Sequence, residues 1–515
     1  MKLAVLHYHL NRGGVTQVIL NQLRALELVA DQCGLSDVLI LHGGRAEAWP
    51  DDFETQAFSL STAAIDGLDY ADGEPLHDAE LADAIAGKLH EFGFRPDETI
   101  LQIHNHSLGK NASLPGAVQI LAQRGFRILL QVHDFAEDLR PANFRNFATA
   151  FQTTDAALVG QHVYPTAPHL HYAVLNARDR SLLLDAGAEP ERVHCLPNPV
   201  AVATTAPSHD DSLQKFQQAH GLNDSQQVVL YPVRGIRRKN VGELLLWAAV
   251  AGEDRVFALT LPATSHDELP AFRRWQTLAD ELKLPVLFNV GQTEGLTFEE
   301  NVAAASHVIT TSAAEGFGLV FLEAWLFDRP LIGRDLPEIT ADFGERGVNL
   351  GHLSDSVQIP RDWLDAGQLQ RDLLNLHSKV CAGYGQPPHA NADSAIRSPL
   401  KNESIDFAAL PTQQQIAVIR QLSTEPAAAQ SLLARNEWIQ RSLDPQTDWT
   451  DLVKANADAV RNGFSLEHSA RDLLTVFRTL LQTPATGPVQ SLPHPERILD
   501  AFLDISHLCP VRVEP

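Results

Sequence analysis

Cysteine is scarce in this chain. Its 515 residues include four cysteines that lie far apart in the sequence: Cys33, Cys195, Cys381 and Cys509. No two of them form a CxxC or CxxH pair, so their spacing argues against a disulfide framework and against a structural zinc site. Free thiols at this low density are typical of a reducing cytosol, and we therefore expect a cytoplasmic protein.

Long apolar stretches and excess positive charge are also missing. No stretch approaches the ~20 uncharged apolar residues of a membrane span, and the first apolar run, Leu3–Tyr8, is too short for a signal sequence. We therefore expect no transmembrane segment. The 64 acidic residues exceed the 40 Lys and Arg residues, which gives a net charge of −24. Because such a surface repels nucleic acid and anionic lipid, we expect no nucleic-acid partner; weak peripheral membrane contact through a small local patch stays compatible with this average.

Several catalytic motifs are absent from the sequence as well. It has no Asp-x-Asp at a strand end, no HExxH and no His/Cys cluster at zinc spacing. It also has no GxSxG elbow and no Walker GxxxxGK[ST] loop. These absences argue against a metal-dependent enzyme of the single-Rossmann type, a serine hydrolase and a P-loop NTPase, and we expect neither a metal nor a cofactor.

Short apolar runs that alternate with helical patterns fill most of the chain. Before the polar stretch at 201–227, these runs are 3–8, 37–41, 99–104, 127–133, 156–160 and 172–175. After it they are 228–233, 256–261, 286–290, 307–311 and 330–333. Runs that are apolar throughout are typical of parallel strands covered by helices on both faces. The sequence therefore predicts an α/β protein with two doubly wound, Rossmann-like domains that face a cleft.

The last third of the chain has a different pattern. Residues 354–460 hold few strand-like runs and several helical patterns, which predicts a helical insertion, with a mobile loop at 387–404. A capped helix follows, with Ser465 as its N-cap. We thus expect an N-terminal domain over 1–205 that is completed by a C-terminal helix at about 465–515. The second domain is expected over 206–353, with 354–460 inserted into it.

The segment AAEGFGLVFLEAW at 313–325 is the most informative one for function. A strand precedes it, Gly316 and Gly318 bracket Phe317, and a helical run begins near Gly318. A glycine turn that opens a helix is a common anion site, because the first amide groups of the helix are unpaired. Glu315 and Glu323 flank this turn and suit the paired hydroxyls of a sugar, although two glutamates eight apart also occur by chance.

A basic run follows the strand at 228–233. It contains Arg234, Arg237, Arg238 and Lys239, an unusual concentration of positive charge in so acidic a protein. At the carboxyl end of a strand, Arg234 and Lys239 could neutralise a diphosphate. The structural alternative is a solvated turn that pairs with surface acids.

Three features of the first half of the chain each have a functional and a structural interpretation. Gly13 and Gly14 follow the first strand and allow close backbone approach, or they simply make a tight turn. His133 ends the strand ILLQVHDF, where it could contact a sugar hydroxyl or serve as a satisfied structural histidine. The run from His104 to Ser107 ends another strand and suits an acceptor site or a polar loop.

These segments together resemble a known family. EGFGLVFLEAW resembles the Glu-x7-Glu signature of family 4 retaining glycosyltransferases, which have the GT-B fold, and Arg234 and Lys239 match the spacing of that family's Arg and Lys pair. Other matching positions, in the family's order, are Gly13-Gly14, Leu196-Pro197-Asn198-Pro199, Pro337-Glu338 and Phe464-Ser465. The resemblance covers roughly residues 1–350 and 455–485, and the 354–460 insertion departs from the family pattern.

The resemblance implies a role for each candidate residue. Glu323 would bind the nucleotide ribose, Glu315 would contact the transferred sugar, and Arg234 and Lys239 would stabilise the leaving diphosphate. The further donor-binding positions would be Gly13, Gly14, Gly316, Phe317 and Gly318. His133 would be a catalytic residue that contacts the donor sugar near the reacting carbon. The reaction would be a front-face retaining transfer without a divalent metal.

We therefore expect a retaining transferase that moves a hexose from a nucleoside-diphosphate sugar to a hydroxyl acceptor. The acidic surface favours a soluble small molecule or saccharide as acceptor. The alternatives are a GT-B glycoside phosphorylase, a GT-B sugar-nucleotide epimerase and a non-catalytic protein that binds sugar nucleotides. The sequence gives no indication of oligomeric state.

Overall fold

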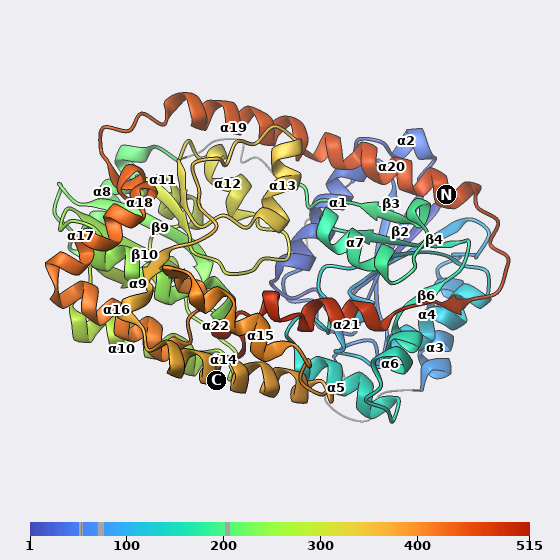
Figure 1. The fold of residues 1–515 in the computed structure, drawn as a ribbon. Helices are drawn as coiled ribbons and strands as arrows, with labels where there is room; N and C mark the ends of the chain where they lie inside the picture. Colours follow the sequence, from blue (N-terminus) through green and yellow to red (C-terminus); the bar gives the residue numbers. More distant parts are fainter. Residues whose placement is uncertain (51–52, 54, 71–76, 201–206, 515) are drawn as a thin grey trace. The chain divides into compact units, whose positions relative to one another are not determined.

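The computed structural model describes residues 1–50, 53, 55–70, 77–200 and 207–514. Its internal contacts divide the chain into two units, shown with their elements in Figure 1. Unit 1 comprises Met1–Ala201, Val380–Pro387 and Phe464–Asp504, and unit 2 comprises Val202–Lys379, Pro388–Gly463 and Ile505–Pro515. The domain boundary expected between residues 205 and 206 lies outside the described residues.

Unit 1 is built on a seven-stranded parallel sheet with the order β3-β2-β1-β4-β5-β7-β8. Its strands are β1 (Lys2–Leu6), β2 (Asp37–His42), β3 (Ser59–Ala64), β4 (Thr99–His104), β5 (Arg127–Gln131), β7 (Leu170–Val174) and β8 (Val193–Cys195). The central strands are buried along almost their whole length, as their apolar runs predict. The order reverses between β1 and β4, which is the point where ligands bind in sheets of this type.

Helices pack against this sheet. They are α1 (Gly14–Glu27), α2 (Ala30–Cys33), α3 (Asp78–Glu91), α4 (Leu114–Gln123), α5 (Pro141–Ala150), α6 (Ala156–Val163), α7 (Ala177–Asp185), α20 (Leu466–Gln482) and α21 (Glu496–Leu503). The late helix α20 lies beside α1, as Figure 1 shows. Apolar residues of the two helices belong to one core. The Ser465 hydroxyl caps α20 by accepting from the His468 amide, as the sequence predicts. A further short pair, β6 (Pro165–Thr166) with β16 (Gln490–Ser491), joins the last part of the unit to its middle.

Two predictions for unit 1 are wrong, and each has a physical reason. The expected strand at 156–160 is the helix α6, because the Asp155 carboxylate accepts from the amides of Ala157 and Leu158 and starts a helix there. The strands β3 and β8 were not expected. β3 is largely polar and partly exposed at the sheet edge, and β8 has three residues, so neither carries a long apolar run.

Unit 2 is built on a five-stranded parallel sheet with the order β11-β10-β9-β12-β13. The strands are β9 (Gln227–Arg234), β10 (Arg255–Leu261), β11 (Val286–Phe288), β12 (His307–Thr310) and β13 (Leu331–Gly333). The helices that precede, connect and follow these strands are α8 (His209–His220), α9 (Val241–Val250), α10 (Leu269–Leu282), α11 (Phe298–Ala304), α12 (Val320–Leu326) and α13 (Pro337–Glu345). Here the strand order reverses between β9 and β12.

The region 354–460 is mainly helical but is not a separate module. Its helices are α14 (Ala366–Gly383), α15 (Ala392–Arg397), α16 (Thr412–Thr424), α17 (Pro426–Arg435), α18 (Glu437–Leu443) and α19 (Thr450–Gly463). A two-stranded antiparallel sheet pairs β14 (Gln358–Pro360) with β15 (Ser404–Asp406). Phe407, Ile419 and Leu432 from this region share one apolar core with Trp247 of α9.

Three boundaries differ from the sequence expectation. The proposed loop at 387–404 contains α15 and a 3-10 turn at Pro399–Lys401. Residues 380–387, inside the expected insertion, cluster with unit 1. Residues from 505 onward, including α22 (Pro510–Val513), cluster with unit 2 rather than with the helix α20.

Candidate functional site

The unit 2 candidates gather where the strand order of its sheet reverses. The 3-10 turn Arg237–Lys239 follows β9, and Ser312 and Glu315 follow β12, which is the neighbour of β9. Parallel strands end at the same edge, so the two loops meet there. Lys239 and Glu315, which come from the two sequence motifs and are 76 positions apart in the chain, are therefore adjacent in the fold.

Lys239 and Glu315 form a buried ion pair at this edge. The Lys239 ammonium contacts Glu315 Oε1, and the two side chains are 12% and 5% exposed. Ser312 donates to the same carboxylate at 2.6 Å. The Tyr231 hydroxyl of β9 lies 2.6 Å from Ser312 Oγ, where either oxygen can donate, and 3.1 Å from the Lys239 carbonyl, which can only accept. The Thr311 hydroxyl donates to the Lys239 carbonyl at 3.0 Å, so both ends of the pair are anchored to the sheet.

The Glu315 carboxylate stays ionised in this setting. Burial alone would raise its pKa, but Lys239 and Arg238 outweigh burial and hold the pKa of Glu315 below its usual range. The pair therefore places one fixed negative and one fixed positive charge side by side at the sheet edge. A carboxylate in this state can accept hydrogen bonds from sugar hydroxyls.

The four basic residues of the run have different environments. Arg234 is exposed and donates to the Thr264 hydroxyl at 3.0 Å. Arg237 is held by Glu268 through an ion pair at 3.3 Å and by the Glu514 carbonyl at 2.7 Å. Arg238 is half-buried, and its Nε is buried without a hydrogen-bond partner among the described residues. Arg237 is thus a structural residue, whereas Arg238, which the sequence analysis did not select, stands next to the Lys239–Glu315 pair.

The residues of the glycine turn after β12 differ in what they contribute to the fold. Gly318 has φ +89°, and an added Cβ would lie 2.8 Å from the Phe321 ring, so the fold itself requires glycine here. The Phe317 ring is buried and packs edge-on against Phe343, with centroids 5.4 Å apart. Gly316 is half-buried in the same turn. The helix α12 that follows has only seven residues, so its dipole is short and the cations must supply most of the positive potential.

Glu323 lies on α12 with its carboxylate half-buried. Burial raises the pKa of Glu323 to about 6. Among the residues that the structure describes, its side-chain oxygens have no hydrogen bond or ion pair. A partly dehydrated carboxylate with open acceptor sites is suited to the two hydroxyls of a ribose.

A histidine cluster lies at the carboxyl ends of the strands in the unit 1 sheet. His7 follows β1, His104 ends β4, and His133 lies just beyond β5. His104 Nδ1 and His133 Nε2 are 2.8 Å apart, and the His133 amide donates to the Asn105 side chain at 2.7 Å. Burial lowers the pKa of His133 to about 4 and that of His7 to about 3, and it lowers the pKa of His104 well below its usual value. All three are therefore neutral at pH 7 and able to exchange hydrogen bonds without adding charge.

Gly13 and Gly14 stand at the start of α1, and both are exposed. Gly13 has an extended backbone, with φ −174°. A Cβ added at Gly14 would meet no atom within 4 Å, and one added at Gly13 would meet only the Asn11 carbonyl at 3.8 Å. The chain itself therefore needs glycine at neither position, which leaves close approach of a ligand as a reason for them.

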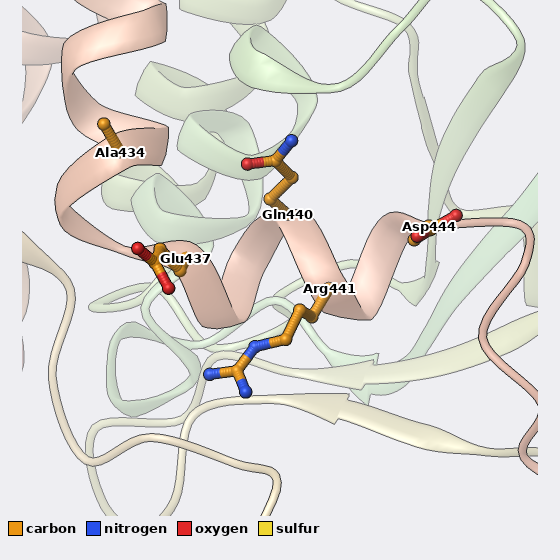
Figure 2. A pocket seen from close by; sticks show the side chains of 5 residues that line it. All are labelled: Ala434, Glu437, Gln440, Arg441 and Asp444. Carbon is orange, nitrogen blue, oxygen red and sulfur yellow. The ribbon is translucent and has the colours of Figure 1, made fainter.

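The pocket drawn in Figure 2 lies away from all of these residues in the sequence. It is lined by Ala434, Glu437, Gln440, Arg441 and Asp444, from α17, α18 and the residue after α18. Two of its three charged side chains are acidic, which does not suit a phosphate. None of the candidate residues lines it.

Comparison with known proteins agrees with the fold. No family model matches the chain. The mannosylglucosyl-3-phosphoglycerate synthase of Petrotoga mobilis is 24% identical over 430 residues, which cover 80% of this chain and 79% of that protein. The sucrose-phosphate synthase of Thermosynechococcus elongatus has a TM-score of 0.54 at 15% identity, over 93% of this chain and 99% of its own. A glycosyltransferase of Rickettsia africae has a TM-score of 0.53 at 13% identity, over 93% of this chain and 98% of its own.

These similarities establish the fold class. The chain has the GT-B fold, with two Rossmann-like units and a helical region near the C-terminus. They also support a glycosyltransferase. No helix in the described part of the chain is both long enough and apolar enough to cross a membrane.

The buried ion pair leads to a stability prediction. Replacing Lys239 with Met leaves the Glu315 charge buried without its partner, so we expect the free energy of unfolding to fall by about 3–5 kcal/mol. Adding Glu315→Gln removes the stranded charge and should recover most of this loss. Urea denaturation of the two variants and the parent measures the effect, and a single variant as stable as the parent would contradict the buried pair.

Glu323 leads to a prediction about pH. Its folded-state pKa of about 6 lies above its unfolded value, so its contribution to stability is largest below about pH 4 and is lost as the pH rises through 6. Glu323→Gln should therefore gain stability relative to the parent over this interval, by at most about 2 kcal/mol. Unfolding measured from pH 4 to pH 7 tests this, and a constant difference between the two proteins would contradict the raised pKa.

Proposed function

We propose that this chain is a family 4 retaining glycosyltransferase, which moves a hexose from a nucleoside-diphosphate sugar to a hydroxyl of a small acceptor. The observation that carries the proposal is the Lys239–Glu315 pair, which is buried at the switch point of the unit 2 sheet with Arg238 beside it. Ligands of doubly wound sheets bind at this point. A cation and an anion fixed there match a ligand that carries both phosphates and hydroxyls.

The cations would act on the leaving group. When the bond between the sugar and the diphosphate breaks, negative charge grows on the diphosphate and positive charge grows on the sugar ring. Lys239 is already held by Glu315 and largely buried, so it would stabilise the diphosphate without reorganising, and the half-buried Arg238 would add a second positive charge. Arg234, at the exposed end of β9, would add a forked contact to the same group.

The carboxylates would bind hydroxyls. Glu315 would accept from the transferred sugar, and Glu323 would accept from the ribose, because its oxygens have no partner among the described residues. Gly316 and Gly318 would shape the turn between the two glutamates, and the buried ring of Phe317 would hold that turn in place. Gly13 and Gly14 would let the backbone approach the donor phosphates, and His133, neutral at pH 7, would contact the sugar near its reacting carbon.

The proposed reaction is a front-face transfer. The acceptor oxygen attacks the anomeric carbon from the face that the diphosphate leaves, and the acceptor proton passes to the departing phosphate oxygen. The configuration at the anomeric carbon is thereby kept. The protein cations would supply the charge stabilisation, and no divalent metal or cofactor is assigned to this step.

The acceptor is proposed to be a small saccharide or related soluble molecule. The relative from Petrotoga mobilis is named for the synthesis of a phosphorylated saccharide derivative, and one structural neighbour is named for the synthesis of a sugar phosphate. Phosphorylated sugars and phosphoglycerate glycosides are therefore the first acceptors to test. The acidic surface of the protein also favours a soluble acceptor over anionic lipid.

A donor screen tests the function directly. Slow hydrolysis of a sugar nucleotide needs no acceptor, so we expect one member of a panel of UDP-, GDP- and ADP-hexoses to release its nucleoside diphosphate. With a phosphorylated sugar acceptor, NMR of the product should show the anomeric configuration of the donor. An inverted product would overturn the retaining mechanism. Turnover with inorganic phosphate in place of nucleotide would favour a phosphorylase, and binding without turnover would favour a non-catalytic protein.

Gly14 supplies a variant that separates binding from folding. Gly14→Ala replaces glycine at the start of α1 with a better helix former in open space, so the melting temperature should be equal or higher. The added methyl group should nevertheless weaken donor binding by tenfold or more. Gly87→Ala is the matched control, because a Cβ there also meets no atom within 4 Å and the residue lies within α3. Equal donor affinity in Gly14→Ala and the parent would contradict the role of this glycine.

A further inference from the structure

Three metal-ligating side chains that the proposed function does not use lie together at the end of α14. They are His377, Cys381 and His389, and their ligand atoms all lie within 4.8 Å of one another. The imidazole rings of His377 and His389 have centroids 5.2 Å apart. Two nitrogens and a sulfur thus converge on one point, although the sequence has no standard zinc motif.

Helix geometry explains how the cluster forms. His377 and Cys381 are four residues apart on the uninterrupted helix α14, so they share one face of it. Their separation is therefore set by the helix itself. The helix ends at Gly383, and the following chain turns at Gly385, whose φ is +71°, before His389 comes back against the His377 ring.

Burial distinguishes this cluster from a reactive thiol or a surface coincidence. His377 is 1% exposed and Cys381 is 0% exposed, whereas His389 is half-buried. A nucleophilic cysteine needs access for its substrate, which a fully covered sulfur does not give. A metal ion needs only limited access, which the half-buried His389 leaves.

We propose that His377, Cys381 and His389 form a zinc site that fastens the loop after α14 to the helix. A thiolate and two imidazoles suit Zn²⁺, whereas Mg²⁺ and Ca²⁺ require oxygen ligands that this set does not contain. Tetrahedral zinc binds such ligands at about 2.0–2.3 Å, so the three side chains close inward around the ion by a small rotation. Three protein ligands leave the fourth position for water.

The test is the zinc content of the full-length protein. After zinc loading and dialysis against metal-free buffer, elemental analysis should give about one zinc per chain. Cys381→Ser and His389→Gln should each lower the affinity at least tenfold, because even outer-sphere partners of bound metals are worth 10–100-fold. Cys33→Ser and the fully exposed His266→Gln are the matched controls and should bind zinc like the parent.

A second measurement keeps the proposal testable if Cys381→Ser folds poorly. Cobalt added to the parent should give thiolate-to-cobalt charge-transfer absorption, which His389→Gln weakens and Cys33→Ser leaves unchanged. Zinc should also slow amide exchange in residues 384–391. Zinc binding that is equal in the parent and in both ligand variants would overturn the site, as would no binding by the parent at micromolar zinc. Neither readout depends on transferase activity, so this site and the proposed function can fail separately.

Discussion

The buried pair between Lys239 and Glu315 is the constraint on which the candidate site of unit 2 depends. Neither charge could stay in so dry a place alone, because a single buried ion costs several kcal/mol. The pair in turn requires β9 and β12 to be neighbours, with Tyr231 and Ser312 completing the hydrogen bonds between their ends. The strand order of the sheet thus determines the charges that a ligand meets at its edge.

Much of the fold could be predicted from the sequence, because buried parallel strands leave long apolar runs. The central strands of both sheets and the capped helix α20 are where their patterns place them. The prediction failed where another signal decided the structure: Asp155 starts a helix at α6, and the polar edge strand β3 carries no apolar run. The shared core between Phe407 and Trp247 depends on contacts far apart in the chain, which no local pattern reveals.

The motifs of the candidate site could be predicted from the sequence, but the contacts between their residues could not. The basic run and the Glu-x7-Glu segment are visible in the sequence, whereas the pairing of Lys239 with Glu315 needs the sheet topology. Spacing alone could not show that Arg237 is held by Glu268 and the Glu514 carbonyl, whereas Arg238 acts on the charge of Glu315. The cluster around Cys381 contains no CxxC or CxxH pair, so the standard zinc spacings do not indicate it. A helical spacing of four between His377 and Cys381 is the signal that could have found it.

The two sheet edges also differ in their chemistry, and this difference bears on what each can bind. The edge of unit 2 carries fixed charges, because Lys239 and Arg238 stand beside the ionised Glu315. The histidines at the edge of unit 1 are equally buried but neutral, since burial holds the pKa of His7 and His133 far below 7. Neutral imidazoles can donate and accept hydrogen bonds without attracting a phosphate. In the proposed function the charge of the diphosphate would therefore be met by unit 2, whereas the histidine edge of unit 1 is suited to the uncharged hydroxyls of a sugar.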